Sequence, residues 1–135
     1  MNDRFYVRYF NKNTKEFEYH KIGAINTKPY TDCTIYEEGQ FCTGIHDKNG
    51  KFIYEGDIAK YVSKNRSKDF NVEIKYLDNI DLIESDWLAT GYFCVDPNSN
   101  LSRCDILTSE TALDYEVIGN IYENKELLEV KDVQF

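Results

Sequence analysis

The chain has 135 residues, of which 41% are hydrophobic and 15% aromatic. This length suits one ordinary domain or two very small ones and excludes a large multidomain enzyme, while the apolar share excludes a disordered chain. The net charge of −8 argues against non-specific binding to nucleic acid or to an anionic membrane.

Short alternating runs of apolar and polar residues, separated by turn residues, predict a mainly β protein. The first two runs, 5–10 and 16–20, flank a polar segment at 11–15 and predict an N-terminal β-hairpin. Residues 21–40 are irregular and contain both glycine and proline. We expect this segment to be a linker between the hairpin and the rest of the chain.

A second hairpin is predicted further along the chain. Residues 40–45 lead into a polar turn, and residues 51–54 lead out of it. At the turn stand Asn49 and Gly50, two residue types that tolerate the positive φ that both central residues of a type I′ turn need. The sequence therefore predicts a type I′ turn here.

The segment after the second hairpin contains a bend, a loop and a strand. Gly56 and Asp57 interrupt the apolar pattern before a short strand at 58–62, which predicts a bulge or sharp bend. Residues 63–69 are polar throughout and predict an exposed loop. Apolar and polar residues then alternate strictly over 70–76, which predicts a half-buried strand.

The remaining part of the chain has a less uniform pattern. Residues 77–86 fit a helix or a loop equally well, so this alternative stays open. Residues 87–95 predict a buried strand, and residues 116–122 predict the last strand. Asn124 is the predicted N-cap of a short helix over 125–130.

Charge is distributed unevenly along the chain. Residues 1–31 hold six basic and three acidic side chains (+3), residues 32–75 hold seven and eight (−1), and residues 76–135 hold three and thirteen (−10), which together give −8. Segments of opposite charge can pair within the chain or between copies in an oligomer, although two solvated faces are the simpler interpretation. We also expect two parts: an N-terminal β-ribbon with its linker over 1–38 and a compact β domain over 39–135.

The sequence lacks the motifs of common enzymes and metal sites. Its two histidines, His20 and His46, have no metal-ligand spacing, and no nucleotide-binding or acyl-transfer motif is present. Because no secretion signal precedes them, the four cysteines are expected to be reduced thiols that fill apolar positions: Cys33, Cys42, Cys94 and Cys104. We therefore expect no enzyme activity, no metal and no cofactor.

Acidic side chains are abundant and allow two interpretations. They include Glu37, Glu38, Asp78, Asp81, Glu84 and Asp86. A pair of carboxylates brought together can act as general acid and base, which makes a hydrolase one hypothesis. A run of charges is more often a solvated face, and that is the interpretation we favour.

Basic and aromatic residues alternate in the first hairpin and form a candidate interaction surface. Its members are Arg4, Tyr6, Arg8, Phe10, Lys12 and Lys15. Cationic grooves with aromatic stacking platforms bind single-stranded nucleic acid. One face of an aromatic hairpin must also pack against something, so burial in the core or in a subunit interface is the favoured interpretation, and a homo-oligomer is the simplest partner.

Two blocks of the sequence resemble the YopX family of bacteriophage and prophage proteins. The first block is residues 41–58 and the second is residues 116–128, and Arg4, Phe10 and Lys15 are similar to the opening pattern of that family. Lys125 departs from the proline usual at its position. The resemblance implies a phage or prophage protein and carries over no catalytic residue. The glycine-bounded strands are also similar to SH3-like barrels, so we expect a hairpin plus a small SH3-like barrel with a short C-terminal helix.

These observations predict a cytoplasmic, non-enzymatic phage or prophage accessory protein that self-associates and binds a host or phage macromolecule. No apolar stretch is long enough to span a bilayer, so no membrane partner is expected. The alternative is an SH3-like nucleic-acid-binding protein that uses the basic N-terminal ribbon and the 63–69 loop. Nucleic acid is the less favoured partner because the chain is acidic.

Overall fold

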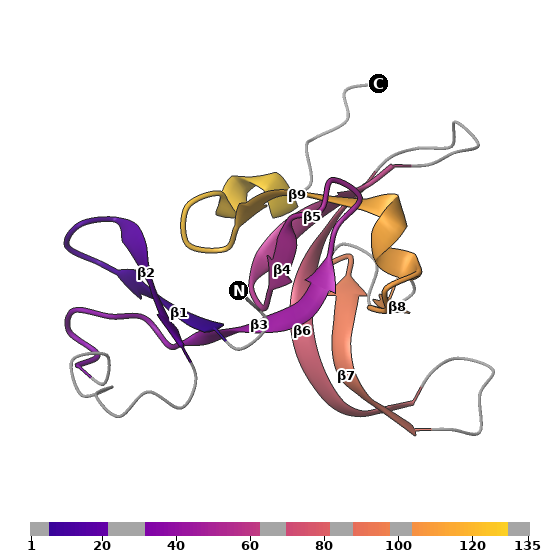
Figure 1. The fold of residues 1–135 in the computed structure, drawn as a ribbon, viewed down its shortest axis with the longest axis horizontal. Helices are drawn as coiled ribbons and strands as arrows, with labels where there is room; N and C mark the ends of the chain where they lie inside the picture. Colours follow the sequence, from indigo (N-terminus) through magenta and orange to yellow (C-terminus); the bar gives the residue numbers. More distant parts are fainter. Residues whose placement is uncertain (1–5, 22–31, 63–69, 82–87, 98–103, 130–135) are drawn as a thin grey trace.

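The computed structural model describes residues 6–21, 32–62, 70–81, 88–97 and 104–129. These residues form nine strands and two short 3₁₀ helices (Figure 1). In chain order they are β1 (Tyr6–Asn11), β2 (Glu16–Lys21), β3 (Gln40–His46), β4 (Phe52–Tyr54), β5 (Asp57–Tyr61), β6 (Phe70–Asp81), β7 (Leu88–Val95), β8 (Cys104–Ile106), η3 (Thr111–Asp114), β9 (Tyr115–Asn120) and η4 (Lys125–Leu128). The prediction of a mainly β protein is confirmed.

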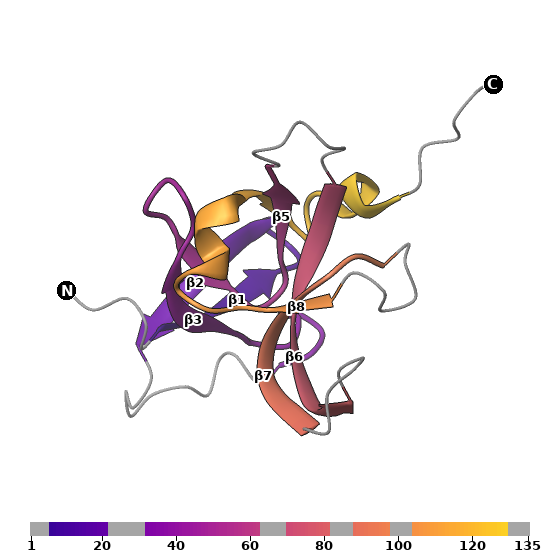
Figure 2. The ribbon, with the colours of Figure 1, turned by 90° about the vertical axis from the view of Figure 1, so that its right-hand side faces the viewer.

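The strands make two antiparallel sheets. One sheet has the order β2-β1-β3-β4 and the other the order β8-β7-β6-β5-β9. Figure 2 shows β6 and β7 side by side in the second sheet, with strands of the first sheet beyond them. In the described part of the chain the pairing closes no barrel, which corrects the predicted SH3-like barrel. The reason is that the edge strands of the first sheet, β2 and β4, do not pair with the edge strands of the second, β8 and β9. The chain passes from the first sheet to the second between β4 and β5.

The change of sheet occurs at Gly56. This residue has a φ of 86°, a conformation that costs a residue with a side chain energy and glycine almost none. Gly56 N–H donates to the carbonyl of Ile74 at 2.8 Å, and the Gly56 carbonyl accepts from Ile121 N–H at 2.9 Å. The bend predicted at Gly56 and Asp57 is confirmed, and it is hydrogen bonded to β6 and to the residue that follows β9.

The predicted N-terminal hairpin is confirmed. β1 and β2 pair in register from Tyr6 opposite Lys21 to Asn11 opposite Glu16. The Asn11 side-chain carbonyl accepts from the backbone N–H groups of the next residues in the loop, at 2.9 and 3.1 Å. Asparagine thus shapes the turn by bonding nearby backbone, as its short polar side chain favours.

The predicted second hairpin is confirmed, but its turn type is wrong. Gly50 has a φ of 82°, whereas Asn49 has no positive φ, so the two cannot form a type I′ turn. Gly50 N–H donates to the Asp47 carbonyl at 3.0 Å. The Asp47 side chain, 3% exposed, accepts from Asn49 and Lys51 N–H at 2.9 Å each and from Val117 N–H at 2.9 Å. Asp47 satisfies three backbone donors and therefore selects the geometry of the turn.

The main core lies on one face of the second sheet. Its buried members are Ile53, Ala59, Val72, Ile74, Cys94, Leu107, Ala112 and Tyr115. Val72 and Ile74 are fully buried and alternate with the half-buried Glu73, as the strict alternation over 70–76 predicts, although Tyr76 is 52% exposed. The Tyr115 hydroxyl donates to Asp105 Oδ2 at 3.0 Å, so the polar end of this core side chain is satisfied.

The last elements correct two predictions. β6 continues to Asp81, so residues 77–81 are strand, neither helix nor loop, and residues 82–86 lie outside the described residues. The predicted C-terminal helix is a single 3₁₀ turn, and its N-cap residue Asn124 makes no side-chain cap bond. The side-chain carbonyl of Asn124 instead accepts from Asn120 N–H at 3.2 Å and so closes the turn that ends β9.

The predicted boundary between the two parts, at 38/39, separates strands that pair in the first sheet. β1 lies before the boundary at 38/39 and β3 after it, and the two pair at Val7 opposite Phe41 and Arg8 opposite Gln40. Residues 32–39, predicted as part of a linker, hydrogen bond to the first hairpin, with Glu37 N–H donating to the Phe10 carbonyl at 3.0 Å. In the described part of the chain no helix has the length and apolar character that a bilayer crossing needs.

Candidate binding cleft

A buried ion pair links the two sheets. Arg8 in β1 and Asp57 at the start of β5 face each other, with Arg8 Nη2 2.8 Å from Asp57 Oδ1 and side chains 5% and 3% exposed. Charges that are removed from water are costly unless each is paired and hydrogen bonded. The pair therefore fixes the position of the first hairpin relative to the β4–β5 turn.

Arg8 has further partners besides Asp57. Arg8 Nε donates to Gln40 Oε1 at 2.8 Å, a bond between two buried side chains. The guanidinium lies over two aromatic rings, 4.2 Å from the centroid of Phe17 and 4.8 Å from that of Tyr54. Aromatic faces attract a cation, and the attraction is stronger away from water. The Arg8 guanidinium thus contacts a buried amide and two aromatic rings of its own chain.

Asp57 joins this cluster to the backbone of β4. Its Oδ2 accepts from Tyr54 N–H at 2.7 Å. Burial raises the pKa of the Asp57 carboxyl above its ordinary value, and the Arg8 guanidinium and the Tyr54 N–H partly offset this by favouring the carboxylate. The ion pair and its hydrogen bonds therefore hold β1, β4 and β5 together.

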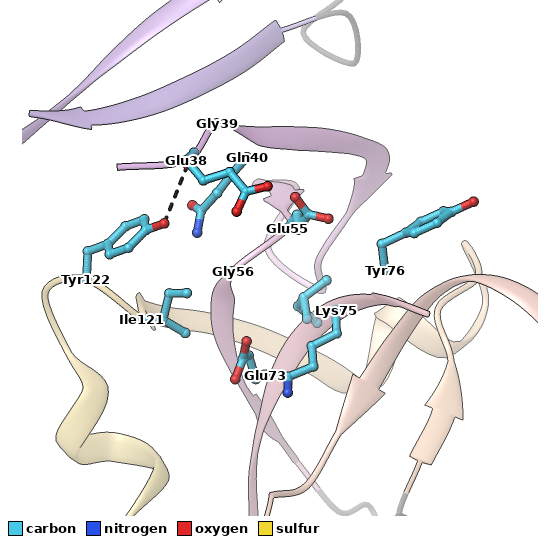
Figure 3. A pocket seen from close by; sticks show the side chains of 11 residues that line it. Glu38, Gly39, Gln40, Glu55, Gly56, Glu73, Lys75, Tyr76, Ile121 and Tyr122 are labelled. Carbon is cyan, nitrogen blue, oxygen red and sulfur yellow. Dashed lines mark hydrogen bonds between the residues drawn. The ribbon is translucent and has the colours of Figure 1, made fainter. Parts of the chain in front are cut away.

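A cleft opens beside this cluster, where the two sheets meet (Figure 3). Its volume is about 260 Å³. Gly56 lies in its wall, and the other lining residues come from the start of β3, the β4–β5 turn, β6 and the residues after β9: Glu38, Gly39, Gln40, Glu55, Glu73, Ile74, Lys75, Tyr76, Ile121 and Tyr122. Figure 3 shows the carboxylates of Glu38, Glu55 and Glu73 around one space.

Burial raises the pKa of two cleft carboxyls. It raises the pKa of Glu55, with a further increase from the charge of Glu38 and a partial decrease from a backbone hydrogen bond to Phe41. It also raises the pKa of Glu73, partly offset by the charges of Lys75 and Lys125. Within the described ranges none of the three glutamates forms an ion pair. A cation that enters the cleft would therefore meet partly dehydrated carboxylates.

Tyr122 forms the aromatic side of the cleft. Its ring stacks on Phe10 with centroids 5.2 Å apart, and its hydroxyl donates to the Glu38 carbonyl at 3.5 Å. Burial, followed by the charges of Glu37 and Glu38, raises the Tyr122 pKa. The hydroxyl thus stays protonated at neutral pH and can act as a donor.

The cleft continues into a second cavity. This cavity has a volume of about 480 Å³ and shares Glu73, Ile121 and Tyr122 with the first. Glu37, Lys125 and Leu128 complete its lining. We call the two adjoining cavities the acidic groove: four glutamates and two lysines line them, and one of the glutamates, Glu37, lies 3.6 Å from Lys12 Nζ.

The residues of the sequence-predicted interaction surface lie in different places. Arg8 and Phe10 are 4% and 6% exposed, so their inclusion in a surface is corrected: the ion pair and the aromatic cluster bury them in their own chain. Tyr6 is half-buried, Lys15 is exposed, and Lys12 Nζ donates to the Cys33 carbonyl at 2.7 Å. Arg4 and the 63–69 loop lie outside the described residues. Whether Tyr6, Lys12 and Lys15 bind a partner stays a prediction.

Sequence analysis partly indicated the acidic groove and missed its centre. Glu37 and Glu38 were among the noted acidic residues, and both line the groove. Glu55 and Glu73 were not singled out, because each stands alone in an apolar context in the sequence. The only sequence feature that could have indicated these two glutamates is their position. Glu55 lies in the first family block, and Glu73 is a polar residue of the alternating strand. Asp78 lies elsewhere and accepts from the Thr90 hydroxyl at 2.8 Å.

The structure describes three of the four cysteines as free thiols. Cys42 and Cys94 are buried and Cys33 is exposed, so the first two occupy the apolar positions that the sequence predicts. Among the described residues no group of three or more His, Cys, Asp and Glu side chains is arranged to hold a metal ion.

The fold and the cleft define a mainly β protein of two antiparallel sheets with an acidic groove where they meet. The chain belongs to the YopX family, since the family model described as YopX protein matches residues 5–129. Among solved structures, protein EF1440 from Enterococcus faecalis is similar at 26% identity, with 91% of this chain and 96% of that chain covered and a TM-score of 0.49. No curated protein matches the chain.

Proposed function

We propose that this protein is a non-enzymatic phage or prophage accessory protein that binds a positively charged segment of a host or phage macromolecule in its acidic groove. The observation that carries the proposal is the set of glutamates around one cavity, the half-buried Glu55 and Glu73 and the exposed Glu38, none of which forms an ion pair within the described ranges. Residues of both family blocks, Gly56 and Tyr122 among them, meet at this groove. A cytoplasmic location is part of the proposal.

A titration with polylysine tests the groove against a general acidic surface. We expect polylysine to bind, and we expect Glu55→Gln to weaken its binding by about threefold to tenfold, since one partly buried charge contact is lost. The matched control is Glu110→Gln, which removes the same charge from an exposed position outside the groove. Equal affinities of the two variants would contradict the proposal. Salt-dependent binding of oligothymidylate without binding of polylysine would favour the nucleic-acid alternative.

The affinity should depend on pH in a defined direction. Because the pKa values of Glu55 and Glu73 are raised above their ordinary 4.5, both carboxyls remain protonated to a higher pH than exposed glutamates do. Affinity for polylysine should therefore increase as the pH rises through these raised values, and binding should release protons. Calorimetry in two buffers of different ionisation enthalpy measures the proton release, and proton uptake on binding would contradict this account.

The non-enzymatic part of the proposal has its own check. Raised pKa values of two carboxyls in one cleft also suit general acid catalysis, which keeps a hydrolase as the second candidate. We expect a lysine peptide incubated with the protein to stay intact by mass spectrometry. Cleavage that Glu55→Gln abolishes would replace the binding proposal with a hydrolytic one.

Self-association is the remaining part of the proposal. It is supported by the basic first segment and the acidic last segment, with net charges of +3 and −10, and by Tyr19 and Phe41, which are 55% and 47% exposed on the first sheet. We expect light scattering at tens of micromolar protein to give a mass above that of one chain, and the mass to fall as salt screens the charges. A monomer at low salt would contradict self-association.

A further inference from the structure

One side chain in the wall of the cleft carries an unused hydrogen-bond donor. Gln40 is 4% exposed, and its Oε1 accepts from Arg8 Nε at 2.8 Å. Because Arg8 can only donate, this bond fixes the amide orientation and places Nε2 on the other side. No hydrogen bond joins Gln40 Nε2 to an acceptor among the described residues.

The free donor faces the cleft next to Gly56. A Cβ built on Gly56 would overlap Gln40 Nε2, so the amide nitrogen lies directly over this glycine. Figure 3 shows the Gln40 amide at the wall of the cleft, with its nitrogen on the Gly56 side. Among the described residues Nε2 is not counted with the buried side-chain atoms that lack a partner, so it keeps contact with the open space of the cleft. A ligand carbonyl at this point would accept a hydrogen bond from it in place of water.

The donor and the carboxylates together select the chemistry of the ligand. Gln40 Nε2 can donate to a carbonyl, an acceptor that brings no further negative charge into the cleft, whereas Glu55 and Glu38 around the same space attract a cation. A peptide that contains lysine or arginine offers both groups, a backbone carbonyl and a cationic side chain, within one residue. The space over Gly56 is filled by the Gln40 amide, so the absence of a side chain at Gly56 is what allows this donor to lie in the wall of the cleft.

We infer that the groove recognises a lysine- or arginine-containing peptide segment, whose backbone carbonyl accepts from Gln40 Nε2 while its cationic side chain binds between Glu38 and Glu55. This inference rests on the proposed function, since it names the ligand of the same groove. It distinguishes a basic protein segment from a polyamine, which has the cations and lacks the carbonyl.

The test uses Gln40→Glu, because glutamate keeps an oxygen for Arg8 Nε and removes the amide donor, while the effect of its added negative charge is measured separately with spermine. The probes are end-blocked tetralysine and spermine, two tetracations of which only the peptide has carbonyls. For the unmodified protein we expect tighter binding of tetralysine than of spermine. In the variant we expect the affinity for tetralysine to fall about threefold to tenfold, as for one lost hydrogen bond, while the affinity for spermine is unchanged or higher because the cleft gains a negative charge.

The outcomes separate the two levels of the proposal. If the variant binds tetralysine and spermine more tightly by the same factor, charge alone governs binding and the role of Gln40 is overturned, while the acidic groove stands. If the unmodified protein binds neither probe, the proposed function and this inference both fail. Retained spermine binding and an unchanged unfolding midpoint show that the variant is folded, so a selective loss of tetralysine supports the inference.

Discussion

Replacing Asp57 with asparagine is expected to destabilise the protein by about 3–5 kcal/mol, the usual cost of removing one partner of a buried ion pair. Asparagine keeps an oxygen for Tyr54 N–H, so the main loss is the charge that faces Arg8. Arginine does not lose its proton inside proteins, and the guanidinium would stay buried without a counter-charge. Chemical denaturation at neutral pH measures the loss.

The reverse substitution should behave differently with pH. In Arg8→Met the carboxyl of Asp57 can become neutral by binding a proton, and burial already raises its pKa above the ordinary value. A folded-state pKa above the unfolded one means that stability is lost as pH rises through the folded value. The destabilisation caused by Arg8→Met should therefore be smallest in acid and grow toward neutral pH, whereas that of Asp57→Asn should lack this increase.

The double variant Arg8→Met/Asp57→Asn completes the cycle. It leaves no buried charge, so its loss of stability should be smaller than the sum of the single losses by at least about 1 kcal/mol, within the range for residues in contact. Additive losses, or a loss below about 0.5 kcal/mol for Asp57→Asn, would show that the pair is not the link between the sheets.

Gly56→Ala is the second substitution with a large expected effect, and Gly50→Ala is its matched control. The two glycines have nearly equal φ values, 86° and 82°, so both variants pay the same backbone cost of about 1–2 kcal/mol. Around Gly50 a new Cβ meets nothing within 4 Å, whereas at Gly56 it would overlap the Gln40 side chain. Moving Gln40 would remove the acceptor of Arg8 Nε and leave a buried donor unsatisfied.

The difference between the two glycine variants should be about 1–3 kcal/mol, the cost of an unsatisfied buried group. Thermal or chemical unfolding of both variants measures it. Equal losses would mean that Gln40 moves freely and that the cluster around Arg8 tolerates rearrangement. Gly56→Ala should also weaken tetralysine binding if the variant folds, since the new methyl group occupies the wall of the cleft.

Local patterns were sufficient to predict most of the strands, although they left 77–81 open and gave no indication of β8. Alternation over 70–76 predicted a strand because a sheet buries one face, and Val72 and Ile74 are fully buried as that rule requires. The polar segments between apolar runs located both hairpins, since turns need residues that bond nearby backbone. The turn type at Asn49 and Gly50 was wrong, because the Asp47 side chain bonds a strand far away in sequence, at Val117, and so overrides the local preference.

The candidate site depended on contacts between distant segments. Arg8 was predicted to belong to a surface because local sequence shows only a cation among aromatics, and nothing in it indicates that Asp57 lies opposite at 2.8 Å. The groove likewise brings Glu38, Glu55 and Glu73 together from three separate segments.

The sequence by itself determined the mainly β class, the two hairpins, the bend at Gly56 and membership of the YopX family. Each of these depends on residues close together in the chain or on a contiguous block. Only the tertiary structure decided that the chain changes sheet at Gly56, that Arg8 is buried, and that an acidic groove forms with a donor from Gln40 in its wall. The physical reason is that burial and ion pairing depend on which distant segments meet, and periodicity describes only which face of a segment is apolar.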